Sequence, residues 1–117
     1  MNAETIIELG STTVPMELTI LENGLPVTGE SPTVALRRTA DNFFLDFNDD
    51  TFKNSGWTTK NQALTEITGV TELAGHYRVF WDSSSTITDQ AVYSFEFTWN
   101  DGADDFFDTD IAVFLKR

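Results

Sequence analysis

Cysteine is absent from this chain of 117 residues, and only seven basic side chains stand against 19 acidic ones. Without cysteine, neither a disulfide framework nor a thiolate metal site can form, so core packing, assembly or bound ions must stabilise the fold. The net charge of −12 repels phosphate groups, so we expect neither a nucleic acid nor a membrane as a partner. The first ten residues lack a basic residue and a long apolar run, and we expect no secretion signal and no membrane span.

Hydrophobic residues, unlike basic ones, are abundant. Of all residues, 40% are hydrophobic and 13% are aromatic, which is enough to offset the conformational entropy that a chain loses on folding. A chain of this length forms one hydrophobic core and has no room for a second. We therefore predict a single compact domain over residues 1–117.

Apolar side chains recur at every second position in much of the chain. Residues 14–20 show the pattern first, and a period of two is typical of half-buried strands. The same pattern predicts strands at residues 34–38, 43–47, 77–81, 93–99 and 111–115. The aromatic positions of 93–99 should face those of 77–81 across the core. About seven or eight short strands separated by turn residues predict an all-β fold of the β-sandwich class.

Two segments are less regular. Residues 48–62 have the composition of a loop but contain Phe52 and Trp57, which predicts a long connection held to the core by two aromatic anchors. In residues 63–67, the spacing of Leu64 and Ile67 fits either a short strand or a helical turn.

Groups that commonly carry catalysis are scarce. His76 is the only histidine, so we expect no histidine pair on a metal and no histidine-based triad. The serines at 83–85 lack the motif that surrounds a nucleophilic serine, and the glycines match no phosphate-binding loop. Paired carboxylates could support glycoside hydrolysis, but a sandwich of this size offers little depth for a cleft. We therefore expect a protein that is not an enzyme.

Aspartates concentrate near the end of the chain. Their carboxylates are the hard oxygen ligands that Ca²⁺ prefers, and the residues that could hold such a structural ion are Asp101, Asp104, Asp105 and Asp108. The spacing is not that of an EF-hand loop. The alternative, which we favour, is a solvated acidic hairpin that limits edge-to-edge pairing and needs no cofactor. A second acidic cluster lies within residues 46–50.

Exposed aromatic side chains are another route to function. Trp57 could present a platform on which a sugar ring stacks, although a role as a core anchor is the favoured interpretation. Phe44, Phe106 and Phe114 lie out of phase with the stronger aromatic pattern of their segments. They are candidates for an interface between subunits, and the alternative is that they fill the core from the second sheet.

Three segments show familiar turn chemistry in a familiar order: LENGLPVTGESPTVALRR, FFLDFNDDTFKNSGW and GHYRVFWD. Over roughly residues 16–99, the chain resembles small immunoglobulin-like β-sandwich proteins among the structural proteins of tailed bacteriophages. The resemblance implies an immunoglobulin-like sandwich of about seven to eight antiparallel strands. It also implies a virion part, such as a capsid decoration, head-fibre, neck or tail accessory subunit.

A protein of that kind would be assembled in the host cytoplasm into the virion. It would bind other virion proteins and would occur as a homo-oligomer or in many copies. A carbohydrate-binding or host-adhesion module, using Trp57 and a Ca²⁺-binding turn, is the alternative. A hydrolase with two facing carboxylates is the third hypothesis.

Overall fold

The computed structural model describes residues 3–100 and 102–116, and nearly every regular element within them is a strand. The strands are β1 (Ala3–Glu8), β2 (Val14–Thr19), β3 (Leu21–Glu22), β4 (Leu25–Pro26), β5 (Thr33–Arg38), β6 (Phe44–Asp46), β7 (Thr51–Lys53), β8 (Gln62–Ala63), β9 (Thr65–Glu66), β10 (His76–Trp81), β11 (Ala91–Asn100) and β12 (Asp105–Leu115). In these ranges the one helical element is the 3₁₀ helix η1 (Thr71–Leu73). None of the described residues forms a helix long and apolar enough to cross a lipid bilayer.

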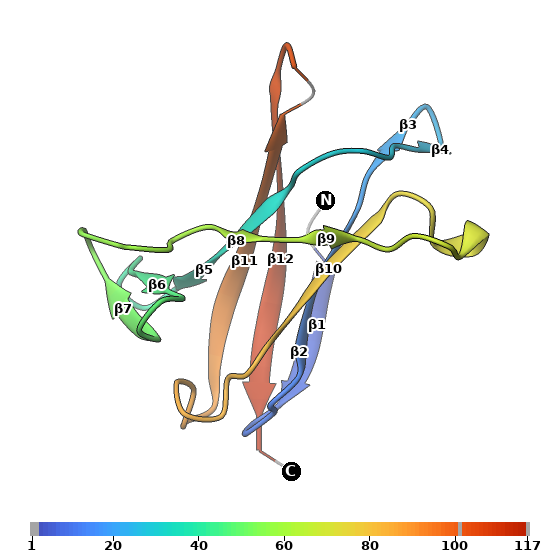
Figure 1. Ribbon diagram of the computed structural model, residues 1–117. Coiled ribbons are helices and arrows are strands. Elements are labelled where there is room, and N and C mark those ends of the chain that lie inside the picture. Colours follow the sequence, from blue (N-terminus) through green and yellow to red (C-terminus); the bar gives the residue numbers. More distant parts are fainter. Residues whose placement is uncertain (1–2, 101, 117) are drawn as a thin grey trace.

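The strands form two main sheets and one separate hairpin (Figure 1). The larger sheet has the order β1–β12–β11–β5–β6–β7, with β8 beside β5, and the smaller sheet has the order β2–β10–β9. Within the described part of the chain, β3 and β4 pair only with each other. Side chains from both sheets share one hydrophobic core, which confirms the predicted all-β sandwich.

Large aromatic side chains fill the space between the sheets. In β11, Tyr93, Phe95 and Phe97 are buried, and in β10 Tyr77 and Trp81 are buried opposite them. This confirms the predicted facing of the two strands. Burial of each such side chain contributes about 1.5–3 kcal/mol to folding. Aliphatic residues of β2 and β5 complete this part of the core: Val14, Met16, Leu18, Val34 and Leu36.

The first strand is a departure from the predicted pattern. β1 runs parallel to β12, so the prediction of purely antiparallel strands is wrong at this edge. Residues 3–8 were not predicted as a strand, because the adjacent Ile6 and Ile7 give no period of two. Ile7 is buried in the core, whereas Ile6 is exposed.

The last strand is longer than residues 111–115. β12 begins at Asp105 because β11 pairs with it over its full length, from Ala91 opposite Phe114 to Asn100 opposite Asp105. Phe114 is fully buried and meets Tyr93 edge to face, with ring centroids 5.5 Å apart. Phe114 therefore fills the core, as the alternative proposed, and its prediction as an interface residue is wrong.

The irregular segments also take definite forms. The predicted connection at 48–62 contains β7, which pairs with β6. Phe52 in β7 stacks on Tyr93 at 5.5 Å between ring centroids, which confirms it as an anchor. Residues 63–67 contain no helical turn; two short strands, β8 and β9, cover most of them.

Candidate functional site

The acidic turn after β11 separates its carboxylates. Asp105 accepts a hydrogen bond from the side-chain amide of Asn100 at 2.6 Å. Asp104 is exposed just before β12, and Asp108 lies within that strand, opposite a core residue. Asp101 lies outside the described residues. Within 3–100 and 102–116, no three His, Cys, Asp or Glu side chains are grouped to hold a metal ion, and the Ca²⁺ site stays a prediction.

Trp57 and Phe44 form a compact cluster with Lys60. The Trp57 indole N–H donates to the carbonyl oxygen of Phe44 at 2.9 Å, and the two rings meet edge to face at 6.3 Å. The Lys60 ammonium lies 4.2 Å from the Phe44 ring centroid and 4.8 Å from that of Trp57. Both aromatic side chains are half-buried. The indole donor and part of the ring surface are thus used within the chain, an arrangement that suits an anchor better than a sugar platform.

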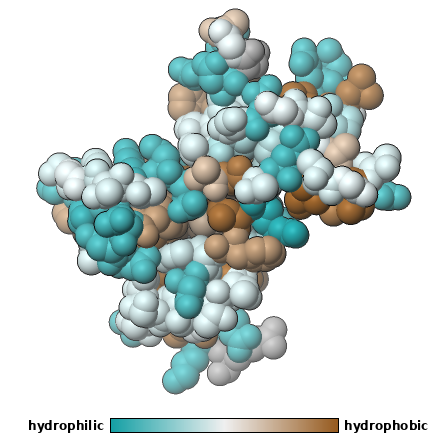
Figure 2. Space-filling model, in the orientation of Figure 1, coloured by the Kyte–Doolittle hydropathy of each residue, from teal (hydrophilic) through white to brown (hydrophobic). Residues whose placement is uncertain are grey.

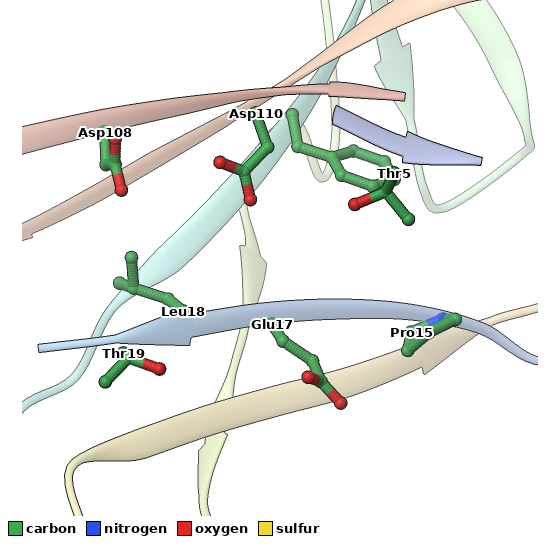
Figure 3. A pocket seen from close by; sticks show the side chains of 8 residues that line it. Thr5, Pro15, Glu17, Leu18, Thr19, Asp108 and Asp110 are labelled. Carbon is green, nitrogen blue, oxygen red and sulfur yellow. The ribbon is translucent and has the colours of Figure 1, made fainter. Parts of the chain in front are cut away.

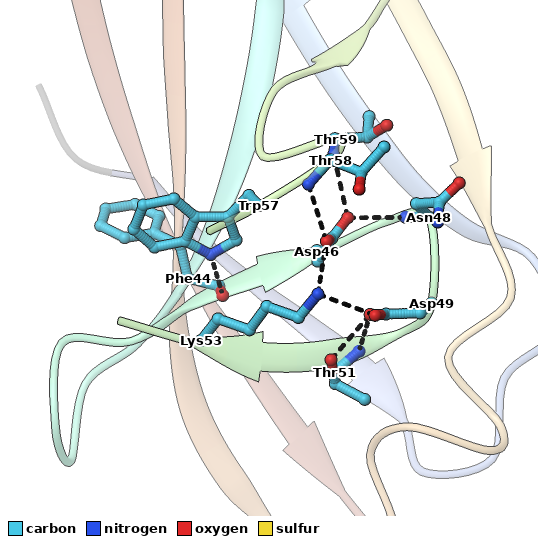
Figure 4. A network of polar contacts seen from close by, with 9 residues as sticks. All are labelled: Phe44, Asp46, Asn48, Asp49, Thr51, Lys53, Trp57, Thr58 and Thr59. Atoms are coloured by element: carbon cyan, nitrogen blue, oxygen red, sulfur yellow. Dashed lines mark hydrogen bonds and ion pairs between the residues drawn. The ribbon is translucent and has the colours of Figure 1, made fainter. Parts of the chain in front are cut away.

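The aspartate at the end of β6 is an internal structural centre (Figure 4). The Asp46 carboxylate is fully buried and accepts hydrogen bonds from the Lys53 ammonium at 2.7 Å and from the N–H groups of Asn48, Thr58 and Thr59 at 3.0, 2.9 and 2.9 Å. These bonds, that from Lys53 above all, hold the pKa of Asp46 far below its usual value. The second acidic cluster therefore shapes the loop after β6.

A cleft of about 490 Å³ opens between the sheets where β1 and β2 form their edges (Figure 3). Asp108 and Asp110 of β12 point into it, facing Leu18 of β2. Its described lining holds three carboxylates and no histidine, cysteine or serine. Both aspartates have interaction partners within the chain. We interpret this cleft as a polar gap at the edge of the core.

A second concave surface lies where the β11–β12 hairpin extends past the sandwich (Figure 1). We call it the hairpin-end groove; its volume is about 300 Å³ and its lining is Ile20, Leu21, Glu22, Val27, Glu30, Trp99 and Phe106. One wall consists of Trp99 and Phe106, which are opposite each other in the strand pairing. Their rings stack at 5.7 Å with an interplanar angle of 18°. Trp99 also packs against the core, which supports the base of this wall.

The other wall is the chain around β3 and β4, and a buried tyrosine holds it. Tyr77 of β10 donates its hydroxyl hydrogen to the carbonyl oxygen of Val27 at 2.9 Å. The hydroxyl oxygen of Tyr77 in turn accepts a hydrogen bond from the N–H of Glu30 at 3.1 Å. Burial raises the pKa of Tyr77, so the hydroxyl retains the proton that it donates.

A glycine brings the β3–β4 hairpin close to the smaller sheet. Gly75 has a φ of +78°, a left-handed conformation that disfavours other residues. A Cβ atom at this position would lie 2.9 Å from the carbonyl oxygen of Ile20 and 3.0 Å from the Cβ of Pro26. The N–H of Ile20 donates to the carbonyl oxygen of Gly75 at 2.9 Å. The close approach therefore requires glycine.

The groove combines exposed apolar side chains with an acidic rim. Leu21 is 57% exposed, Leu25 beside it is 69% exposed and Phe106 is 40% exposed. Hydrophobic side chains gather near the β3–β4 hairpin at the upper right of Figure 2, among hydrophilic ones. Among the described residues, the groove lining includes Glu22 and Glu30 and no basic residue. This surface fits a ligand that is apolar and positively charged.

Sequence reasoning identified part of this groove. Phe106 was named as an interface candidate, and it does lie exposed in the groove wall. Trp99 was assigned to the core pattern of its strand, and Leu21 and Leu25 were overlooked. The signal for the leucines is local, because they flank the Asn23-Gly24 turn of a hairpin too short to bury them.

No protein-family model, no curated protein and no solved structure matches the chain. The geometry of its surfaces therefore carries the functional proposal.

Proposed function

We propose that this protein is a non-enzymatic structural subunit that binds other proteins of an assembly through the hairpin-end groove. The stacked Trp99 and Phe106, which line a depression together with the exposed Leu21, carry the proposal. Aromatic side chains in such depressions contribute much of the binding energy at protein interfaces. The acidic rim at Glu22 and Glu30 favours a segment with Lys or Arg beside its apolar side chain.

The size of the groove suits repeated, individually weak contacts. A single large apolar side chain contributes about 1.5–3 kcal/mol when it is buried, and part of that free energy is lost in ordering the two partners. One segment would therefore bind with roughly millimolar affinity, which corresponds to about 4 kcal/mol, once attraction to the acidic rim adds to the apolar contact. Several copies on a repetitive surface would bind much more tightly through their effective concentration.

A virion accessory role is the narrower form of the proposal: capsid decoration, head fibre, neck or tail. It rests on the resemblance of three sequence segments to phage structural proteins. The strand order supports the immunoglobulin-like part of that resemblance, because β2–β10–β9 against β12–β11–β5–β6 corresponds to B–E–D against G–F–C–C′ in variable-type immunoglobulin sandwiches. Mass spectrometry of particles purified from a producing culture tests this form, and absence of the chain from them would refute it.

Selection from a random peptide library displayed on an unrelated carrier tests the general proposal. We expect the purified chain to enrich peptides that combine large apolar residues with Lys or Arg. The Phe106→Ala variant should lose at least tenfold in affinity for these peptides. Phe80→Ala, which also removes an exposed phenylalanine but outside the groove lining, should bind them normally. Enriched peptides that bind both variants equally would refute binding in the groove.

A further inference from the structure

The outer face of the larger sheet carries a second apolar surface, separate from the hairpin-end groove. We call it the outer patch, and its members are Ile6, Val92, Ile111, Val113 and Leu115. They come from the neighbouring strands β1, β12 and β11, and the register sets Val113 between Ile6 and Val92. Their chain neighbours Ile7, Ala112 and Phe114 are buried, so alternation directs the outer patch away from the core.

The patch is exposed and continuous. Ile6 is 66% exposed, Val92 is 45% exposed and Leu115 is 40% exposed. With strands about 4.8 Å apart and residues about 3.4 Å apart, the patch spans roughly 10 Å by 14 Å. A contiguous aliphatic surface rimmed by polar residues marks an interaction site more often than single exposed residues do.

Residues that pair in register across the four neighbouring strands form a row on this face. The two ends of one such row carry charges of opposite sign. The row runs from Glu4 in β1 through Ile111 and Ser94 to Arg37 in β5. Arg37 donates its Nε–H to Glu96 at 2.7 Å. Its Nη2 makes no hydrogen bond with the described part of the chain, so the guanidinium retains donors for a second carboxylate.

We propose that a second copy of this chain covers the outer patch in a two-fold dimer whose axis runs parallel to the strands, between β11 and β12. Such an axis exchanges β12 with β11 and β1 with β5 across the interface. It places Val113 of each copy over Val92 of the other. It also places Glu4 of each copy opposite Arg37 of the other, because both residues belong to one row.

The charge pattern selects this axis over the other two-fold arrangement of facing sheets. An axis perpendicular to the strands would set β1 of one copy against β1 of the other. Glu4 and Glu8 of both copies would then crowd together, since both belong to β1, and like charges at close range oppose association. The parallel axis avoids this repulsion and pairs opposite charges twice.

The dimer is a weak one. Four strands of about six residues project an area of roughly 400 Å² per copy, compared with about 800 Å² per partner in a standard stable interface. The charge of −12 on each copy also opposes association. Because salt screens this long-range repulsion, dimerisation should strengthen as ionic strength rises from about 0.01 M to about 0.15 M.

Sedimentation equilibrium of the full chain, from roughly 1 µM to roughly 1 mM to cover weak association, tests the proposal. The average mass should rise from the 13.1 kDa of one chain toward twice that value. Ile6→Glu should weaken the dimer at least tenfold. Leu25→Glu introduces the same charge at a similarly exposed leucine outside the patch and should leave the dimer intact. A single-chain mass at all concentrations, or equal effects of the two variants, would overturn the proposal.

Charge reversal tests the axis itself. Glu4→Arg and Arg37→Glu should each weaken the dimer, and the double variant should recover at least half of the lost association free energy. Circular dichroism and thermal melting of each monomer check that Arg37→Glu still folds beside Glu96. No recovery in a folded double variant would overturn the parallel axis. A purely monomeric protein would leave peptide binding in the hairpin-end groove unaffected, so the two proposals fail separately.

Discussion

The Lys53 ammonium lies 2.7 Å from the carboxylate of Asp46, which has no exposed surface. A buried carboxylate is stable only when its charge is paired and its oxygens accept hydrogen bonds. Asp46 meets both conditions, because three backbone N–H groups complete its set of donors. The pair therefore links β6, β7 and the loop that follows them.

Replacement of Asp46 by asparagine should destabilise this region strongly. The amide has one acceptor oxygen in place of two, and its NH₂ group would point at donors. We expect Asp46→Asn to lower the melting temperature by about 5–10 °C. Asp49→Asn removes an exposed partner of the same lysine and should lower it far less. Equal shifts of the two variants in thermal unfolding would contradict the structural role of Asp46.

The low pKa of Asp46 also predicts how stability depends on pH. Because the pKa is lower in the folded chain than in the unfolded chain, the stabilisation is fully present above the unfolded value of about 4. It is lost progressively as the pH falls below that value toward the folded pKa. The difference in melting temperature between the wild type and Asp46→Asn should therefore shrink between about pH 5 and about pH 2. A constant difference over this range would contradict the assignment.

Any side chain at position 75 should destabilise the fold, because the chain approaches Gly75 too closely to leave room for it. Gly75→Ala adds backbone strain at positive φ and a clash with Ile20 and Pro26, for an expected cost of about 3 kcal/mol. Gly69→Ala is the matched control, because its φ of +82° is similar and no atom lies within 4 Å of its added Cβ. Backbone strain alone should lower the free energy of unfolding of Gly69→Ala by about 1–2 kcal/mol. Urea unfolding measures both values, and a smaller loss for Gly75→Ala would contradict the packing of the β3–β4 hairpin.

Two buried serines should respond in opposite ways to loss of the hydroxyl. The Ser94 hydroxyl is buried without a hydrogen-bond partner in the described structure, so Ser94→Ala should be neutral or stabilising by up to about 1 kcal/mol. The Ser83 hydroxyl donates to the carbonyl oxygen of Ser11 at 2.8 Å, so Ser83→Ala should cost about 1 kcal/mol. Chemical denaturation distinguishes the two. A destabilised Ser94→Ala protein would show that its hydroxyl has a partner.

The strands that alternate clearly were predictable, because burial of one face leaves a period of two in the residue types. β2, β5, β10 and β11 follow the predicted ranges closely. The first half of β12 was not predicted, because Asp108 and Asp110 occupy its inner positions where apolar residues were expected. In that segment, pairing with β11 determines the strand, and pairing partners cannot be deduced from local composition.

The sites were harder to predict than the strands, because each depends on residues that are distant in the sequence. The hairpin-end groove joins Leu21 to Trp99, and the outer patch joins Ile6 to Val92. The sequence did not indicate that Lys53 is the partner of Asp46, because several aspartates lie near this lysine. Phe106 and Phe114 lie on the same alternation of β12, so neither breaks the pattern once the strand starts at Asp105.

Nuclear magnetic resonance of the tryptophan side chains tests the central claim most directly. The chain has three tryptophans, and the indole N–H signal of Trp99 can be assigned by its loss in Trp99→Phe. On titration with the most enriched apolar, basic peptide, the Trp99 signal should shift and saturate, whereas the signal of Trp57, bonded to Phe44, should stay in place. An unchanged Trp99 signal while the peptide binds would contradict recognition by the hairpin-end groove.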